Sequence, residues 1–416
     1  MSVDLESLVD DSHYDVVIIG AGMVGASVAI GLADMGLNIL LVDSFDFSTR
    51  NGDYAPSYDE RSTALSSGTK DIFRQLGLWD VIAKNICHIS GIHVSEQKRF
   101  GGLRMSAEEQ GQEALGYVVR NNWLGSCLID RIGEQNITFC TPAKVSEIQS
   151  CQSHKLITLS SDTSSDKQVR AELVIICDGA NSDTAKLLGI GSSTECYKQH
   201  ALVANITTEL PNEGMAFERF TPNGPLALLP LSSHECSLVW THESQKIDYY
   251  MEADEAVFCR ELEQVFGERL GKIEKCGQRN SYPLKITLSD EQCRSGILLL
   301  GNAAHSIHPV AGQGFNLAIR GVASFLEMVK ELLKISEDSP SYARLANLSR
   351  LCESRESDLS KTVLMSDQLV KVFVHPSPFI ALFRDLGLIA LDNQSSLKSA
   401  FANRAMGLSE KKARFG

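Results

Sequence analysis

What this sequence of 416 residues lacks already narrows its function. The eleven cysteines stand singly, with no C-x-x-C pair and no zinc-like spacing, so neither a metal centre nor a dithiol redox site is expected. The formal net charge of -13 argues against nucleic acid as a general partner, because phosphate backbones attract basic surfaces. An odd cysteine count without a signal peptide predicts reduced thiols in the cytoplasm.

A transmembrane span is also missing, because no apolar run approaches the length of about 20 residues that a helix needs to cross a bilayer. The nearest candidate, Pro378 to Leu391, is interrupted by Arg384 and Asp385. It lies in a tail, residues 341–416, whose pattern favours helices. Three roles stay open for this apolar stretch: protein core, which we expect first, a docking face for partners, or a peripheral membrane contact.

The first strong motif lies near the N-terminus. The β-branched run Val16 to Ile19 predicts a parallel strand covered on both faces. Gly20, Gly22 and Gly25 follow in G-x-G-x-x-G spacing, which permits a tight turn, a close approach to a pyrophosphate and a closely packed helix. Asp43 ends the next strand at about the 20-residue separation expected of an acid that binds a ribose hydroxyl. Together these features predict a Rossmann-type dinucleotide site.

A second glycine-rich segment follows about 290 residues later. Leu298 to Leu300 predict a buried strand, and Gly301 a sharp turn at its end. The small loop Gly312 to Gly314 then leads into a helical pattern, and free backbone N–H groups at such a helix start suit an anionic ligand. Taken alone, this segment fits an ordinary strand-loop-helix connection equally well. Paired with the first motif, it fits one long ligand, with the ADP half on the first segment and a flavin ring on the second.

Three separated motifs are shared with one enzyme family: the N-terminal fingerprint, Leu173 to Ser182 (LVIICDGANS) and Gly301 to Asn316. From Tyr14 onward the chain resembles the FAD-dependent aromatic hydroxylases, flavoprotein monooxygenases similar to p-hydroxybenzoate hydroxylase. The nearest branch hydroxylates the polyprenylated ring in ubiquinone biosynthesis. Within that branch, Ala216 to Pro230 and Cys236 to Trp240 look most like the members that act on 2-octaprenyl-6-methoxyphenol.

This resemblance implies an α/β fold in three parts. The first part is a discontinuous Rossmann-type FAD-binding domain, made of residues 14–85, 115–190 and 290–340. The second is an inserted substrate domain with a mainly antiparallel β-sheet, made of residues 86–114 and 191–289. The third is a helical C-terminal region, residues 341–416. It implies FAD as the cofactor, NADPH or NADH as transient reductant unless another donor replaces it, and hydroxylation through a C4a-hydroperoxyflavin formed with dioxygen. The expected location is cytoplasmic, and peripheral contact with the inner face of the membrane and with other ubiquinone-biosynthesis proteins stays open.

The resemblance also implies roles for single residues. Pro309 is expected beside the reacting carbon of the flavin, and His308 and His305 are candidates for proton transfer, with simple packing as the alternative. Gly321 stands where relatives commonly have Asp, which predicts a looser anchoring of its helix. Substrate-pocket candidates, unless they form ordinary sheet core, are Phe217, Phe220, Leu228 and Trp240. Cofactor contacts are expected from Gly20, Gly22, Gly25, Asp43, Arg61, Arg120, Asp178, Gly301, Asn302, Gly312, Gln313, Gly314, Phe315 and Asn316.

Two other functions stay open on these residues alone. One is a flavin-dependent reductase or oxidase that acts on an isoprenoid. The other is a non-catalytic flavin-bound subunit of a biosynthetic complex. Ring position, prenyl length, electron donor and oligomeric state are not encoded in any motif of the chain.

Overall fold

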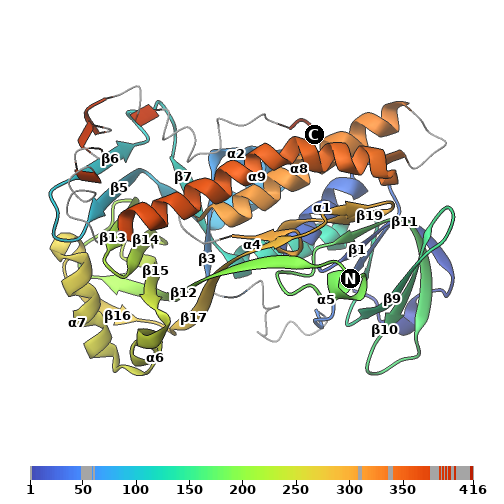
Figure 1. Ribbon diagram of the computed structural model, residues 1–416, viewed down its shortest axis with the longest axis horizontal. Coiled ribbons are helices and arrows are strands. Elements are labelled where there is room, and N and C mark those ends of the chain that lie inside the picture. Colours follow the sequence, from blue (N-terminus) through green and yellow to red (C-terminus); the bar gives the residue numbers. More distant parts are fainter. Residues whose placement is uncertain are drawn as a thin grey trace.

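A computed structural model describes most of the chain: residues 2–47, 59, 61–307, 312–335, 341–374, 384–385, 387, 389–390, 392–394, 398–399 and 413–415, with side chains of the last long helix described to residue 364. Figure 1 shows two sheet regions at opposite ends of an elongated molecule and two long helices that lie against each other, of which the second extends from one region to the other. These helices are α8 (Gln313–Ile335) and α9 (Leu345–Val374).

An eight-stranded sheet forms one region, in the order β18-β19-β11-β1-β2-β8, and β10 and β9 extend it from β11. Val16, Val17 and Ile18 on its central strand β1 are fully buried, as their β-branched run predicts. Parallel pairing of β1 with β11, and of β11 with β19, brings the carboxyl ends of these three strands to one edge. The strands are β1 (Ser12–Ile19), β2 (Ile39–Val42), β8 (Ile137–Cys140), β9 (Lys144–Ser150), β10 (Lys155–Ser160), β11 (Lys167–Ile176), β18 (Cys293–Arg294) and β19 (Ile297–Leu299).

Helices cover this sheet and bury its larger hydrophobic core. Helix α1 packs against α4 and α8, and it approaches α8 so closely that a Cβ at Gly31 would lie 2.3 Å from a methyl carbon of Leu326. Gly31 therefore lets the two helices meet. The α-helices that precede α8 in the chain are α1 (Met23–Ala33), α2 (Ser67–Gln75), α3 (Trp79–Ile82), α4 (Asn121–Glu134), α5 (Asp183–Leu187), α6 (Ser244–Glu252) and α7 (Glu255–Phe266).

A nine-stranded sheet forms the other region, in the order β20-β17-β12-β15-β14-β13-β5-β6, and β16 pairs with β12. All of its pairings are antiparallel except the one between β13 and β5. Helices α6 and α7 lie at this end of the molecule in Figure 1. The strands are β5 (Gly91–Glu96), β6 (Gly102–Ser106), β12 (Ser192–Thr208), β13 (Met215–Thr221), β14 (Gly224–Pro230), β15 (Glu235–Glu243), β16 (Ile273–Cys276), β17 (Asn280–Ser289) and β20 (His305–Ser306).

A small sheet, a pair of long strands and a long helix join the two regions. A small sheet in the order β3-β7-β4 lies between them, formed by β3 (Ser62–Leu65), β4 (Ile86–Ile89) and β7 (Gly116–Arg120). The long strands β12 and β17 run from one region to the other (Figure 1). Helix α9 contacts β18 of the eight-stranded sheet and β13 and β14 of the nine-stranded sheet. The fold class predicted from the sequence is confirmed.

No helix within the described part of the chain combines the length and apolarity that crossing a membrane requires. The apolar stretch Pro378 to Leu391 falls mostly outside the described residues. Its two charges are described, and both contact the β5–β6 hairpin region: Arg384 donates to Glu96 at 3.0 Å, and Asp385 accepts from the backbone N–H of Gly101 at 3.3 Å. These contacts hold this part of the tail against the nine-stranded sheet.

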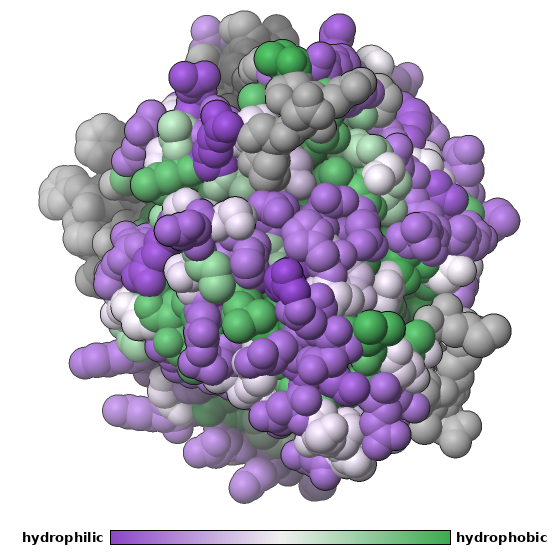
Figure 2. All heavy atoms as spheres, turned by 90° about the vertical axis from the view of Figure 1, so that its right-hand side faces the viewer, coloured by the Kyte–Doolittle hydropathy of each residue, from purple (hydrophilic) through white to green (hydrophobic). Residues whose placement is uncertain are grey.

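The outer end of the eight-stranded sheet region faces the viewer in Figure 2, and polar side chains predominate there, with apolar ones in separate small patches. The described residues of this face form no broad apolar surface. The apolar surfaces relevant to a ligand lie inside, between the two regions.

Candidate active site

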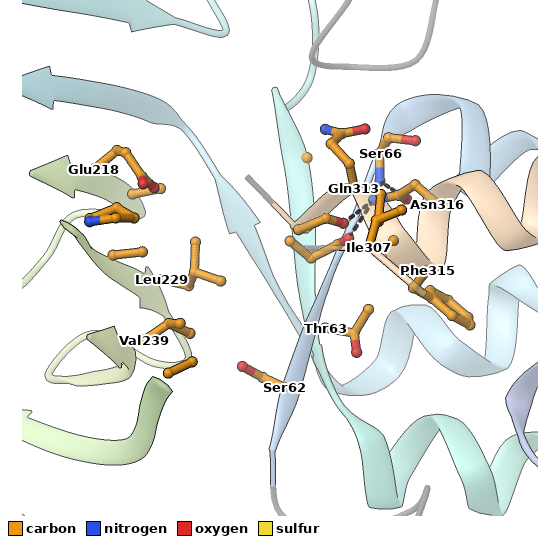
Figure 3. Close-up of a pocket in the computed structure, with 18 of the residues that line it drawn as sticks. Ser62, Thr63, Ser66, Glu218, Leu229, Val239, Ile307, Gln313, Phe315 and Asn316 are labelled. Atoms are coloured by element: carbon orange, nitrogen blue, oxygen red, sulfur yellow. Dashed lines mark hydrogen bonds between the residues drawn. The ribbon is translucent and has the colours of Figure 1, made fainter. Parts of the chain in front are cut away.

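One continuous cavity of about 900 Å³ lies between the two sheet regions. Gly22 to Val24, from the N-terminal fingerprint, and Gly312 to Asn316, from the late segment, both line it. Across from the late segment, residues of β13, β14 and β15 form the opposite wall, as Figure 3 shows for Glu218, Leu229 and Val239. The two glycine segments thus border one space, which is the arrangement that a single long ligand needs.

The fingerprint glycines stand where no side chain fits. Gly20 has φ +99°, and a Cβ there would lie 2.6 Å from the carbonyl oxygen of Cys177. A Cβ at Gly25 would lie 1.9 Å from the carbonyl oxygen of Gly20, and backbone on both sides cannot give way. Gly22 is the N-cap of α1 and carries no capping side chain. The first N–H groups of α1 therefore suit a phosphate group.

Two carboxylates follow the carboxyl ends of β2 and β11, the strands on either side of β1. Asp43 accepts hydrogen bonds from the backbone N–H groups of Ala21 at 2.6 Å and Phe45 at 2.8 Å. Burial raises the pKa of Asp43, and the nearby Asp178 raises it further, although these N–H groups oppose the change. Asp178 accepts from the N–H of Thr184 at 3.2 Å, while its other carboxylate oxygen is buried without a hydrogen bond among the described residues. An orphaned acceptor of this kind suits a ligand hydroxyl, so these residues fit the ADP-ribose half or ribityl chain of FAD.

The late segment is held by one side chain. Asn316 accepts hydrogen bonds from the N–H of Ser66 at 2.9 Å and the hydroxyl of Thr69 at 2.7 Å. Its amide donates to the carbonyl oxygens of Ala64 and Gly312, each at 2.9 Å. Three of these bonds tie the start of α8 to the junction of β3 and α2, and the fourth, to Gly312, fixes the loop that precedes α8. The amide of Asn316 is thus used within the protein, and it positions the loop rather than reaching out of it.

Two glycines of this segment, Gly312 and Gly314, present backbone to the cavity. Gly301 and Gly312 each have φ +62°, and a Cβ at Gly312 would lie 3.2 Å from the Cβ of Ala64. Asn302, Gln313 and Phe315 line the cavity, as do Gly312 and Gly314. An almost flat lining of this kind fits an isoalloxazine ring, and the N–H groups at the start of α8 suit negative charge on it.

The two candidate arginines lie differently. Arg61 lines the cavity, pairs with Asp59 at 2.5 Å and stacks over the ring of Tyr282 at 4.7 Å. Arg120 is not among the lining residues, and its guanidinium donates to Glu235 at 3.1 Å. The next residue, Asn121, borders the cavity instead. Arg120 precedes α4 directly, so its side chain leaves the backbone on the side of β15.

Two of the predicted catalytic residues, His308 and Pro309, lie outside the described residues. The neighbouring His305 is buried, and its Nε2 lies 3.5 Å from the guanidinium of Arg355. Burial, together with the positive charge of Arg355, lowers the pKa of His305 to about 4. The ring is therefore neutral near pH 7 and is not among the residues that line the cavity, which favours packing over proton transfer.

The expectation of a loosely anchored helix at Gly321 is wrong. Arg320 on α8 forms a two-point ion pair with Asp358 on α9, with N–O distances of 2.8 and 2.9 Å. Gly321 itself makes room for the guanidinium of Arg355, because a Cβ there would lie 2.2 Å from Arg355 Nη2. The missing side chain lets α9 lie close against α8, and the ion pair anchors the two helices to each other.

The four candidates for a substrate pocket divide between the two faces of the nine-stranded sheet. Phe220 lines the cavity. Phe217 borders it, but its ring lies on the opposite face of the sheet, in the core with Leu228, and packs edge-on against Phe266 of α7 at 5.2 Å. The prediction that Leu228 and Trp240 line the pocket is corrected: both lie in the core with residues of α6 and α7. Side chains alternate along a strand, so their neighbours line the cavity instead: Ala227, Leu229, Val239 and Thr241.

Several lining residues were not predicted from the sequence. Ser62 to Ser66 form β3 and the start of α2, directly after the arginine that the resemblance singled out. Tyr282 and Lys285 lie on β17, and Ile307 follows β20. Glu218 on β13 lines the cavity between two apolar residues, and its place in the alternating series Ala216, Glu218, Phe220 was a signal in the sequence. A carboxyl group on an otherwise apolar strand face is the feature that periodicity alone would have revealed.

Comparison with known proteins identifies the family. The family model described as FAD binding domain matches residues 13–337, which is more than half of the chain. The chain belongs to this FAD-binding family.

Groups of three or more His, Cys, Asp or Glu side chains that would hold a metal ion are absent from the part of the chain that the structure describes.

Two relatives match over nearly the full length. The chain is 32% identical over 401 residues to ubiquinone hydroxylase UbiL of Rhodospirillum rubrum, covering 95% of this chain and 90% of the relative. It is 28% identical over 395 residues to 3-demethoxyubiquinol 3-hydroxylase of Escherichia coli, covering 95% and 98%. The prediction of an FAD-dependent monooxygenase of the branch that contains the ubiquinone hydroxylases is thereby confirmed, with FAD as its cofactor.

The fold is similar to that of p-nitrophenol 4-monooxygenase PnpA from Pseudomonas putida, with a TM-score of 0.75 and 16% sequence identity. This likeness covers 96% of the present chain and 100% of the other. At that identity it supports the fold, and the family rests on the sequence matches.

Proposed function

We propose that this protein hydroxylates the aromatic ring of a polyprenylated phenol in ubiquinone biosynthesis, with a substrate like 2-octaprenyl-6-methoxyphenol. The overall reaction uses one molecule of dioxygen and two electrons from NADPH or NADH. One oxygen atom enters the ring, and the other leaves as water. FAD, when bound, supplies the chemistry that passes the electrons to dioxygen and makes one of its oxygen atoms electrophilic.

The observation that carries this proposal is the single cavity between two unlike walls. One wall consists of the fingerprint and the late loop, whose glycines and free N–H groups fit a flat, anionic cofactor. The other wall is a β-sheet with apolar residues such as Ala227, Leu229 and Val239. A ring held between these walls lies against the cofactor and is kept from water, which protects a reactive oxygen donor.

Individual residues take the following roles in this proposal. Gly20, Gly22, Gly25 and Asp43 hold the ADP half, and Asp178 binds a hydroxyl group of the cofactor. Gly301, Asn302, Arg61 and residues 312–315 hold the flavin half, and Asn316 fixes the loop that carries them. His308 and Pro309 remain predictions from the resemblance, and Arg120 is given no cofactor contact.

Part of the cavity lining is apolar and suits the prenyl tail. Side chains of β4, β5, β6 and the approach to β7 form this part, and they contribute no charged group: Ile89, Ile92, Val94, Leu103, Met105 and Leu115. Burying a tail along them stabilises the complex by roughly 25 cal/mol per Å² of apolar surface. Because a prenylated phenol resides in a membrane, we place the protein in the cytoplasm, in peripheral contact with the inner face, where it meets other proteins of the same pathway.

Isotope labelling tests the proposal. Purified FAD-loaded protein is given NADPH or NADH and a methoxyphenol with a two-isoprene tail under ¹⁸O₂, and the product is analysed by mass spectrometry. We expect one labelled oxygen atom in the product for each phenol consumed. A reductase or an oxidase gives unlabelled product, and a non-catalytic subunit gives none. Either result refutes the proposal.

A further inference from the structure

One carboxyl group on the sheet wall of the cavity has no role yet in the proposed reaction. Glu218 lies on β13, and Figure 3 shows its side chain on the sheet wall, facing across the cavity toward the side that carries Ser66, Gln313 and Ile307. It therefore stands opposite the loop that fits the flavin ring. A substrate ring between the two walls would lie within its reach.

The neighbours of Glu218 within the sheet are apolar. Its partner on β5 is Val94 and its partner on β14 is Ala227, and both line the cavity. Ala216 and Phe220, the nearest residues on the same face of β13, also line it. Among the described residues, no hydrogen bond or ion pair involves the carboxyl group of Glu218.

The charged groups near this wall are used elsewhere. On the opposite face of the same strands, His93 packs against the ring of Phe217, and Arg219 donates to the carbonyl oxygen of Val265 on α7. Glu96 at the end of β5 binds Arg384. Strand β14 carries no titratable side chain. Within the described part of the chain, the charged residues that line the cavity besides Glu218 are Arg61, Lys285 and Arg384.

The lack of a hydrogen-bond partner for the Glu218 carboxyl group, among the residues that the structure describes, points to a ligand. A carboxyl group in apolar surroundings destabilises a fold unless a ligand completes its hydrogen bonds. Loss of hydration alone raises the pKa of Glu218 to about 7, with no charged neighbour contributing. Near pH 7 the group is therefore divided between its acid and base forms, which is the range in which a carboxylate accepts and returns protons.

We propose that Glu218 binds the phenolic hydroxyl of the substrate and accepts its proton as the ring is hydroxylated. This inference rests on the proposed function. The O–H bond of the phenol breaks, its proton passes to the Glu218 carboxylate, and the electron pair left on oxygen is delocalised into the ring. The ring carbon becomes more nucleophilic and forms its bond to the electrophilic oxygen that FAD and dioxygen supply, while the O–O bond breaks and the second oxygen atom leaves as water. The same ring carbon then loses its hydrogen as a proton, which restores the aromatic ring, and Glu218 returns its proton to the phenolate oxygen. The same contact aligns the ring, because the phenol oxygen has one fixed acceptor on an apolar wall.

The test compares two substrates and two variants of the full-length, FAD-loaded protein. The substrates are the methoxyphenol with a two-isoprene tail and its O-methyl ether, which has no phenolic proton. The variants are Glu218→Gln, which keeps the shape but not the basicity, and the control Glu274→Gln on the exposed part of β16. FAD content and the change of the flavin spectrum on adding phenol show that each variant is folded and binds the ring.

We expect Glu218→Gln to lower kcat for labelled product by about 100-fold or more, with a smaller change in KM, because general-base catalysis contributes about 10²–10⁴-fold. The methyl ether should lower kcat of the unaltered protein by a similar factor and should cause no further loss in the variant. The kcat of the unaltered protein should rise with pH through about 7, whereas that of the variant should not. Glu274→Gln should match the unaltered protein throughout.

Three results would overturn the inference. One is a Glu218→Gln variant within about twofold of the unaltered protein, well below the effect of a general base. Another is a kcat of Glu218→Gln on the methyl ether that shows both losses in full, the one caused by the variant and the one caused by the ether. If Glu218→Gln does not fold, Glu218→Asp and the methyl ether take its place. The third contrary result is then a kcat that does not change with pH in either Glu218→Asp or the unaltered protein, which counts against Glu218 as the proton acceptor. Absence of labelled product from the unaltered protein refutes the proposed function instead.

Discussion

The two walls of the cavity are built by different means. On the cofactor side, glycines and backbone N–H groups form the surface, and the carbonyl oxygen of Gly20 lies where a side chain at Gly25 would stand. On the sheet side, alternating side chains form it, and a shift of one position exchanges Leu229 in the cavity for Leu228 in the core. At Gly20 and Gly25 the first wall has no room for a side chain, whereas the second wall is set by which side chains of each strand face the cavity.

The largest effect should follow from a methyl group on the cofactor wall. Gly25→Ala places a Cβ 1.9 Å from the carbonyl oxygen of Gly20, so the start of α1 must move away from β1. We expect FAD content to fall to less than about a tenth, because a loss of about 1.4 kcal/mol is already tenfold in affinity. The flavin absorbance of the purified protein measures this.

A matched control for that change lies on the sheet side. A Cβ at Gly102 on β6 would be 3.5 Å from the nearest atom, which is an ordinary contact. Gly102→Ala should therefore keep full FAD content. If Gly25→Ala kept its FAD as well, the fingerprint would not form the tight cradle described here.

The next effect separates the two faces of β14. Leu228 is fully buried with Leu238 and Trp240, so Leu228→Ala should lower the free energy of unfolding by about 2–5 kcal/mol and leave KM for the phenol unchanged. Leu229→Ala, on the cavity face, should cost less than about 1.5 kcal/mol and raise KM. Denaturant unfolding and steady-state kinetics of the two variants distinguish the faces. Equal effects of the two changes on KM would contradict the assigned alternation.

A smaller effect concerns stability against pH. The pKa of Glu218 is raised in the folded protein to about 7 from an ordinary value of 4.5, so the carboxyl group weakens the fold once it must ionise. This cost is absent below about pH 4.5, grows between about pH 4.5 and 7, and is constant above that range. Glu218→Gln should therefore raise the free energy of unfolding at pH 8 by roughly 1–3 kcal/mol, and change it little at pH 5.

Unfolding curves of both proteins at the two pH values check this prediction. A destabilised variant at pH 8 would mean that the carboxylate has a stabilising partner in the protein. Such a result would remove the reason for assigning it a ligand. The exposed Glu274→Gln variant should show no difference at either pH.

The smallest effect is expected at Arg120, which the sequence suggested as a cofactor contact. Its ion pair with Glu235 is partly exposed, and pairs of this kind contribute about 0–1 kcal/mol. Arg120→Ala should therefore leave FAD content unchanged and lower stability by less than about 1 kcal/mol. A loss of flavin from this variant would restore the residue to the site.

The contrast between the walls also explains what the sequence predicted and what it did not. Glycine motifs report a backbone requirement directly, so Gly20, Gly22 and Gly25 were found from spacing alone, and pairing of β19 with β11 brought the late segment beside them. On the sheet, both Leu228 and Leu229 are apolar, and only the observed register shows which one faces the cavity. Gly321 looked like a lost anchor because its partner, Arg355, is distant in sequence and its contact depends on how α9 packs.

The most direct test of the central claim, that both walls enclose one ligand space, is a titration of the FAD-loaded protein with the prenylated methoxyphenol, followed by the visible spectrum of the flavin. We expect the phenol to shift the flavin bands, and we expect Leu229→Trp, which fills the space opposite the late loop, to abolish the shift while FAD stays bound. A spectrum that does not respond to the phenol, or that responds equally in Leu229→Trp, would place the flavin and the phenol in separate spaces and contradict the account.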